Sequence, residues 1–148
     1  MLKVLIPVDG SPSSRNSVEK AMSTGVLRDA QVHIMTVISP TYAAPTRNPY
    51  MAAEMVTELA DANKKYAETV LAEAKQAISP VVEVTSAVIR EGNPAEEILK
   101  YAEEIGSNLV VMGNRGLSTF NKVLLGSVSQ KVLTHSCCSV LIVKERSE

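Results

Sequence analysis

The chain has 148 residues, 45% of them apolar and 21% charged, which is typical of a folded domain with its own hydrophobic core. Its 15 lysines and arginines are balanced by 16 aspartates and glutamates, and aromatic residues make up 3%, which argues against the basic surface and stacking side chains of a nucleic-acid-binding protein. No apolar run reaches the ~20 residues of a membrane span, so we expect neither a nucleic-acid nor a membrane partner.

The chain begins with a short apolar run. Residues 2–8 are almost continuously apolar and end at Asp9-Gly10, which predicts a strand buried on both faces and followed by a turn. The run is too short for a signal peptide. Ser11 and Pro12 then supply an N-cap and a first helical residue, and the pattern after them predicts a helix to about Leu27.

Two further strand and helix pairs follow. Residues 32–38 are rich in β-branched residues and predict a second strand, in which we expect His33 to be packed rather than a ligand. A proline-bearing loop leads to residues 51–78, where apolar residues recur every three or four positions and predict a long amphipathic helix. Residues 82–89 predict the third strand.

The last third of the chain continues the alternation. Asn93, Pro94 and Glu96 predict a capped helix that runs to about Ile105, and residues 108–112 predict a fourth strand. Ser127 and Gln130 form a second capping-box pattern, and residues 139–144 predict the final strand.

Alternating strands and helices require right-handed crossovers, which give a parallel sheet covered on both faces. We therefore predict an α/β fold of one domain over residues 1–148, a doubly wound, Rossmann-like sheet of five parallel strands. The expected strand order is 3-2-1-4-5. Ligands of such folds bind beyond the carboxyl ends of the strands, which directs attention to the turns after strands one and four.

A glycine-containing loop joins the fourth strand to the last helix. Gly113, Gly116 and Gly126 would let an anion approach the backbone, and a helix beginning near Ser127 would offer unpaired N–H groups. The chain has no Asp or Glu between residues 107 and 143, so the segment is locally cationic. Its cations are Arg115, Lys122 and Lys131. From spacing alone, the glycines can equally be turn and cap residues.

The pattern Gly113-x2-Gly116-x9-Gly126-Ser127 resembles the ATP-binding signature of the universal stress protein family, and the resemblance covers essentially the whole chain. It departs from the family at Ser139, where proline is usual. The resemblance implies that adenine and ribose contact Pro7, Val8, Asp9 and Val37. It also implies that the phosphates contact Gly113, Gly116, Gly126, Ser127, Val128 and Ser129. Met112 and Arg115 complete the expected cofactor site.

We expect the bound cofactor to be ATP with Mg²⁺, because adjacent phosphate charges need neutralising. The expected function is a nucleotide-dependent stress or signalling protein with an unknown protein partner. A slow ATPase or phosphotransferase, and a partner-binding dimer with a vestigial pocket, are the alternatives. We expect no catalytic residue, since His135 would lie ~12 Å along the helix from Ser127. Alternatively, Asp9 has no role in ligand binding and only ends its strand in an Asp-Gly turn.

The C-terminal segment supports two further expectations. Cys137 and Cys138 are adjacent, so they are poor candidates for bridging each other, and we expect buried, inert thiols in a reducing cytoplasm. The final strand is the sheet edge in the predicted order, and a bare apolar edge promotes association. We therefore expect a homodimer through Val140-Leu141-Ile142-Val143, which the family resemblance also implies.

Overall fold

The computed structural model describes residues 1–40, 49–116 and 125–145. Strands and helices alternate along these residues, and the five strands form one parallel sheet in the order β3-β2-β1-β4-β5. The predicted fold class and strand order are therefore confirmed. The elements are β1 (Leu2–Pro7), α1 (Pro12–Ser23), β2 (Ala30–Ile38), α2 (Pro49–Ile78), β3 (Val84–Glu91), α3 (Pro94–Glu104), β4 (Leu109–Gly113), α4 (Ser127–His135) and β5 (Ser139–Val143).

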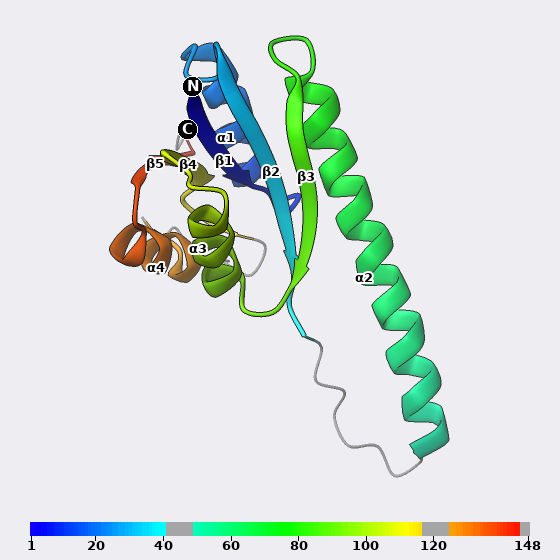
Figure 1. The fold of residues 1–148 in the computed structure, drawn as a ribbon. Coiled ribbons are helices and arrows are strands. Elements are labelled where there is room, and N and C mark those ends of the chain that lie inside the picture. Colours follow the sequence, from blue (N-terminus) through cyan, green and yellow to red (C-terminus); the bar gives the residue numbers. More distant parts are fainter. Residues whose placement is uncertain (41–48, 117–124, 146–148) are drawn as a thin grey trace.

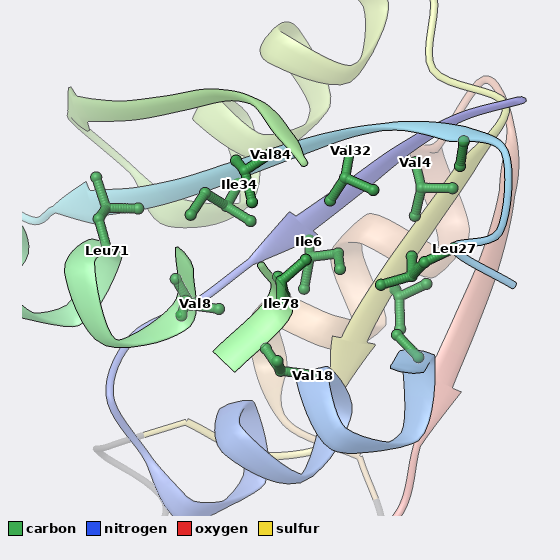
Figure 2. Packing of buried hydrophobic residues seen from close by; sticks show 14 of the residues in the cluster. Val4, Ile6, Val8, Val18, Leu27, Val32, Ile34, Leu71, Ile78 and Val84 are labelled. Carbon is green, nitrogen blue, oxygen red and sulfur yellow. The ribbon is translucent and has the colours of Figure 1, made fainter. Parts of the chain in front are cut away.

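The sheet is covered on both faces (Figure 1), with α1 and α2 on one side and α3 and α4 on the other. Successive residues of a strand point to opposite faces, so a doubly covered strand is apolar throughout. In β1, Val4 and Ile6 are fully buried toward α1 and α2 (Figure 2), whereas Leu5 is fully buried toward α3 and α4. Burying each such side chain contributes about 1.5–3 kcal/mol to folding.

Helix α1 ends at Ser23, four residues before the predicted end at Leu27. The chain leaves the helix because Gly25 (φ +76°) and Asp29 (φ +56°) adopt left-handed backbone conformations, which are incompatible with a continuing right-handed helix. Leu27 is nevertheless fully buried, so its apolar side chain serves the core from a turn.

Strand β3 lies two residues later than the sequence predicted. The N–H groups of Val81 and Val82 donate to the carbonyl of Ile78 at 2.9 and 3.2 Å, so this segment still forms the turn after α2. The pairing of β2 with β3 then shifts register between Val32 and His33.

Helix α2 begins at Pro49 rather than at the predicted Met51, and it is longer than the sheet that it covers. Its 30 residues span ~45 Å, against ~30 Å for the nine residues of β2. The N-terminal part of α2 projects past the strands (Figure 1). Val70 and Ala74, in the C-terminal half of the helix, are buried, whereas Met55 and Leu59, near its start, are exposed. Within the described residues, no helix is both long and apolar enough to cross a membrane.

His33 of β2 packs against Ser86 of β3 and Tyr101 of α3, as the sequence suggested. Its Nδ1 lies 2.7 Å from Ser86 Oγ, which lies 2.9 Å from the Tyr101 hydroxyl. Burial lowers the pKa of His33 because it disfavours the imidazolium, and the nearby charge of Lys3 lowers it further.

This lowered pKa predicts a pH dependence of stability. Below about pH 6.5 the unfolded chain binds a proton that folded His33 resists, so the free energy of unfolding falls as the pH drops through the folded pKa. We expect urea unfolding at about pH 7.5 and 5.5 to show a smaller loss for His33→Asn than for the wild type. His135 is present in both proteins, so equal losses would show that His33 does not contribute.

Candidate functional site

A cavity of about 290 Å³ lies at the carboxyl end of the sheet, on the face that α3 and α4 cover. The ends of β1, β2 and β4 and the first turns of α3 and α4 line it. In an open α/β sheet this is the edge at which ligands bind, because strand order reverses there and the flanking helices diverge.

The residues predicted from the sequence all line this one cavity. They are Pro7, Val8, Asp9, Val37, Met112, Gly113, Arg115, Gly116, Gly126, Ser127, Val128 and Ser129. Sequence reasoning missed Ser14, Met35, Thr36, Ser39, Pro94 and Ile98. A usable signal existed for some of them: strands β1 and β2 are parallel neighbours that end at the same edge, so the end of β2 could have been examined in full.

The lining of the cavity combines apolar and polar groups. Val37, Ile98 and Met112 supply aliphatic and thioether surface, and Gly126 and Ser127 belong to the start of α4. A pocket with this lining suits a ligand that carries both an apolar ring and polar or charged groups.

The polar part of the lining includes the N-terminus of α4, whose N-cap residue has no side chain. Ser11 caps α1 by accepting from Ser14 N, and Asn93 caps α3 by accepting from Glu96 N, each at 3.1 Å. Helix α4 instead has Gly126 at its N-cap, without a side-chain cap and without an acidic residue in the first turn. The predicted capping box of Ser127 and Gln130 is therefore wrong, because Ser127 is already the first helical residue. Uncapped N–H groups at the positive end of a helix favour an anion.

Gly113 serves close packing at the base of the cavity. A Cβ at this position would lie 2.3 Å from Ser13 Oγ and 2.7 Å from the Ser13 carbonyl oxygen. The end of β4 therefore approaches the first turn of α1 as closely as only glycine allows. At Gly116, by contrast, a Cβ would lie 3.2 Å from Asp9 Oδ2, which is the end of a side chain.

Ser129 is committed to the same packing. Its hydroxyl donates to the carbonyl of Gly113 at 2.8 Å, and the side chain is buried. A hydroxyl carries one proton, and this one is already donated to a carbonyl, so Ser129 would reach an anion through its backbone N–H. Ser127, in contrast, is exposed at the first turn of α4.

The two carboxylate oxygens of Asp9 have different surroundings. Oδ1 accepts from Ser11 N at 2.9 Å and so forms the turn after β1. Oδ2 lies on the side of Gly116, at the cavity wall. The Asp9 carbonyl accepts from the Tyr66 hydroxyl at 3.0 Å, and its N–H donates to Ser14 Oγ at 3.2 Å. The Asp-Gly turn therefore forms and still leaves one oxygen directed toward the site.

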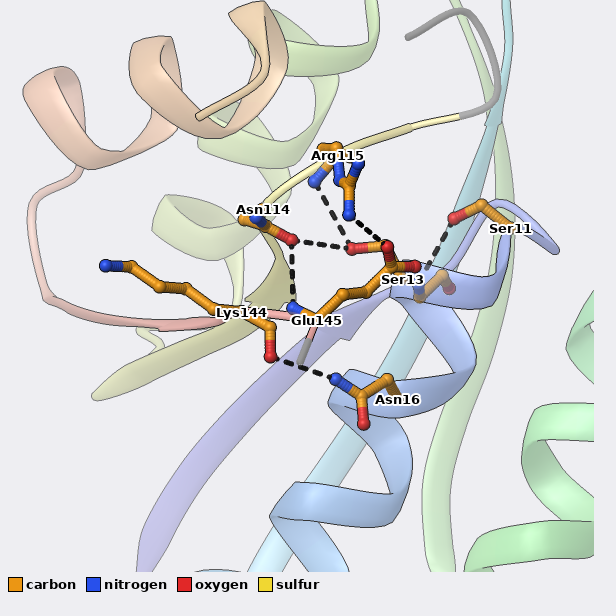
Figure 3. A network of polar contacts seen from close by, with 8 residues as sticks. Ser11, Ser13, Asn16, Asn114, Arg115, Lys144 and Glu145 are labelled. Carbon is orange, nitrogen blue, oxygen red and sulfur yellow. Dashed lines mark hydrogen bonds and ion pairs between the residues drawn. The ribbon is translucent and has the colours of Figure 1, made fainter. Parts of the chain in front are cut away.

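Asn114, which sequence reasoning missed, connects both ends of the glycine-containing loop. It is buried, and its carbonyl accepts from Gly126 N at 2.6 Å while its N–H donates to the Val143 carbonyl at 3.2 Å. Its side-chain oxygen accepts from Ser13 Oγ at 3.2 Å and from Glu145 N at 3.4 Å (Figure 3). Residues 117–124 of the loop lie outside the described residues.

The cations of the acid-free segment have partners from elsewhere in the chain. Arg115 pairs with Glu145, and Lys131 Nζ lies 3.3 Å from Glu96 Oε1. The expectation of a locally cationic segment is therefore wrong for these two residues, because folding brings carboxylates to them. Lys122 lies outside the described residues.

The cysteines behave differently from each other. Cys137 is exposed and Cys138 is half-buried against the core beneath α3 and α4. Both residues lie in the bend between α4 and β5, and of the two only Cys138 packs against this core. The expectation that both are buried is wrong for Cys137.

Residues 1–144 match the model of the universal stress protein family. The chain belongs to this family. Universal stress protein YxiE of Bacillus subtilis is 32% identical over 145 residues, which cover 96% of this chain and 98% of the relative.

Two solved structures of comparable length superpose on this universal stress protein. The hypothetical protein MJ0577 does so with a TM-score of 0.81 at 27% identity, covering 99% of this chain and 98% of its own. A universal stress protein in complex with cAMP has a TM-score of 0.68 at 28% identity and covers 96% of both chains.

The packing at Gly113 predicts a difference between two glycines of the signature. We expect Gly113→Ala to lower the free energy of unfolding by about 1–3 kcal/mol, because the backbone of Ser13 must move. Gly116→Ala is the matched control and should cost less than about 1 kcal/mol, since only the end of Asp9 must adjust. Urea titrations measure both, and equal losses would contradict the packing role of Gly113.

Proposed function

We propose that this universal stress protein binds ATP in the cavity and acts as a nucleotide-dependent stress or signalling protein. The observation that carries the proposal is a cavity lined both by the N-terminus of α4, where Gly126 provides no side-chain cap, and by the apolar side chains of Val37, Ile98 and Met112. Phosphate groups suit the helix N-terminus, and an adenine ring suits the apolar side chains.

Different residues of the cavity would contact the adenine, the ribose and the phosphates. Adenine would lie against Val37, Ile98 and Met112, and Asp9 Oδ2 would accept a hydrogen bond from a ribose hydroxyl. The phosphates would lie beside Gly116 and the first turn of α4, where Gly126 at the N-cap offers no side chain to the N–H groups of the helix start.

The relatives support the ligand class. A universal stress protein at 28% identity forms a complex with cAMP, which is also an adenine nucleotide. The choice of ATP rests on the resemblance of Gly113-x2-Gly116-x9-Gly126-Ser127 to the ATP-binding signature of the family.

Mg²⁺ would arrive with the nucleotide. Among the described residues, no group of three His, Cys, Asp or Glu side chains could hold a metal ion. Mg²⁺ commonly binds through phosphate oxygens and waters with few protein ligands, so the nucleotide itself would hold most of its coordination sphere.

We also propose a homodimer through β5. This strand ends the sheet, and Leu141 is 37% exposed on it. Pairing of two edges would cover the open N–H and C=O groups of Val140-Leu141-Ile142-Val143. The unbridged thiols of Cys137 and Cys138 fit a reducing compartment, and we propose the cytoplasm.

Thermal unfolding tests the nucleotide proposal. ATP with Mg²⁺ at a hundred times its dissociation constant should stabilise stripped protein by about 2.7 kcal/mol. We expect Asp9→Asn to weaken ATP binding about tenfold, because Oδ1 can keep the turn while the charged Oδ2 is lost. Asp61→Asn, on the exposed surface of α2, is the control and should bind like the wild type. Absence of stabilisation at millimolar ATP would refute the proposal.

Sedimentation tests the dimer. We expect Leu141→Lys to shift the protein from dimer to monomer, because two lysines would then oppose each other at the paired edges. Val81→Lys changes a residue that is 47% exposed beyond α2, and it should leave the dimer intact. A Leu141→Lys variant that sediments as the wild type does would exclude this edge as the interface.

A further inference from the structure

Arg115 lies at the cavity wall but its charge is directed to a carboxylate of the same chain. Its Nη2 forms an ion pair with Glu145 (Figure 3), and each side chain is 26% exposed. Its Nε is buried and has no hydrogen-bond partner in the part of the chain that the structure describes. Among the described residues, the Arg115 guanidinium therefore has one ion-pair partner that a ligand could replace and one N–H group, at Nε, that forms no hydrogen bond.

Both members of this ion pair are fixed through their backbones. The N–H of Arg115 donates to Ser13 Oγ at 3.2 Å, and the N–H of Glu145 donates to Asn114 Oδ1 at 3.4 Å. Arg115 directly precedes Gly116, and both residues line the cavity in which we propose that the phosphates bind. The side chains can therefore exchange partners while their backbones stay in place.

We propose that Glu145 competes with the nucleotide for Arg115, and that a phosphate group displaces the carboxylate from the guanidinium. This inference rests on the proposed function and concerns the regulation of the same site. It assigns to Arg115 the role of a sensor for ligand phosphates, and to Glu145 the role of an internal anion that lowers the affinity for them.

The chemistry of the three groups supports an exchange. A guanidinium is a planar fork of five donors that binds a carboxylate or a phosphate in the same bidentate way. A polyphosphate brings several negative charges within a Debye length of Glu145, and in a partly buried site their repulsion is weakly screened. The unused Nε offers the phosphate one more charge-assisted hydrogen bond.

The exchange would also connect the cavity to the edge strand. Glu145 follows β5 by two residues, and the Lys144 carbonyl between them accepts from Asn16 Nδ2 of α1 at 3.2 Å. Release of the Glu145 side chain would remove one of the contacts that hold the end of this strand against the body of the protein.

A double-mutant cycle tests the proposal. Calorimetric titration would compare ATP with Mg²⁺ and adenosine as probes, in the wild type, Glu145→Gln, Arg115→Met and the double variant. We expect Glu145→Gln to bind ATP roughly fivefold more tightly, with adenosine unchanged because it has no phosphate. In the Arg115→Met background, Glu145→Gln should have no effect on ATP.

The control and the contrary outcomes separate this inference from others. Glu96→Gln removes a carboxylate paired with Lys131 of α4 and should leave ATP affinity unchanged. Tightening by Glu145→Gln in both backgrounds would show simple repulsion and overturn the exchange. ATP binding that is unchanged or weaker in Glu145→Gln overturns this inference alone, whereas a wild type that does not bind ATP overturns the proposed function as well.

Discussion

The candidate site depends on the close approach of β4 to the first turn of α1. Gly113 has no Cβ, so the backbone of Ser13 can lie against it, and the Ser13 hydroxyl then reaches Asn114 and Arg115. Asn114 in turn holds Gly126 and the segment after β5. The start of α4, the floor of the cavity and the Arg115–Glu145 pair are all positioned through this one contact.

The same contact changes the meaning of the glycine signature. Glycine in such a loop is usually taken as room for a phosphate, yet the missing side chain of Gly113 is replaced by part of the protein itself. Ser129 acts likewise, since its hydroxyl is bonded to the Gly113 carbonyl. Gly113 and the Ser129 hydroxyl therefore contribute to the site by packing and hydrogen bonding within the protein, whereas the first turn of α4 lines the cavity.

Much of the fold could be predicted from sequence because its signals are local. The apolar runs of β1 and β2 require cover on both faces, and Ser11 and Asn93 mark helix starts that the structure confirms. The gathering of the predicted residues around one cavity follows from the same order, since parallel strands end together.

The errors concern interactions that sequence distance conceals. Arg115 and Glu145 are 30 positions apart and Glu96 and Lys131 are 35 apart, so the charges that neutralise the acid-free segment were not visible in it. The exposure of the apolar residues Met55 and Leu59 on α2 has a similar cause. Periodicity identifies the apolar side of a helix, but the length of the neighbouring strands decides how much of that side is covered.

The central claim is that phosphate groups bind the uncapped N–H groups at the start of α4. Amide chemical shifts of Ser127, Val128 and Ser129, followed by NMR during titration with ATP and Mg²⁺ and then with adenosine, test it most directly. We expect large changes at these three amides with ATP and small ones with adenosine. Saturable ATP binding that leaves the three amides unchanged would contradict it.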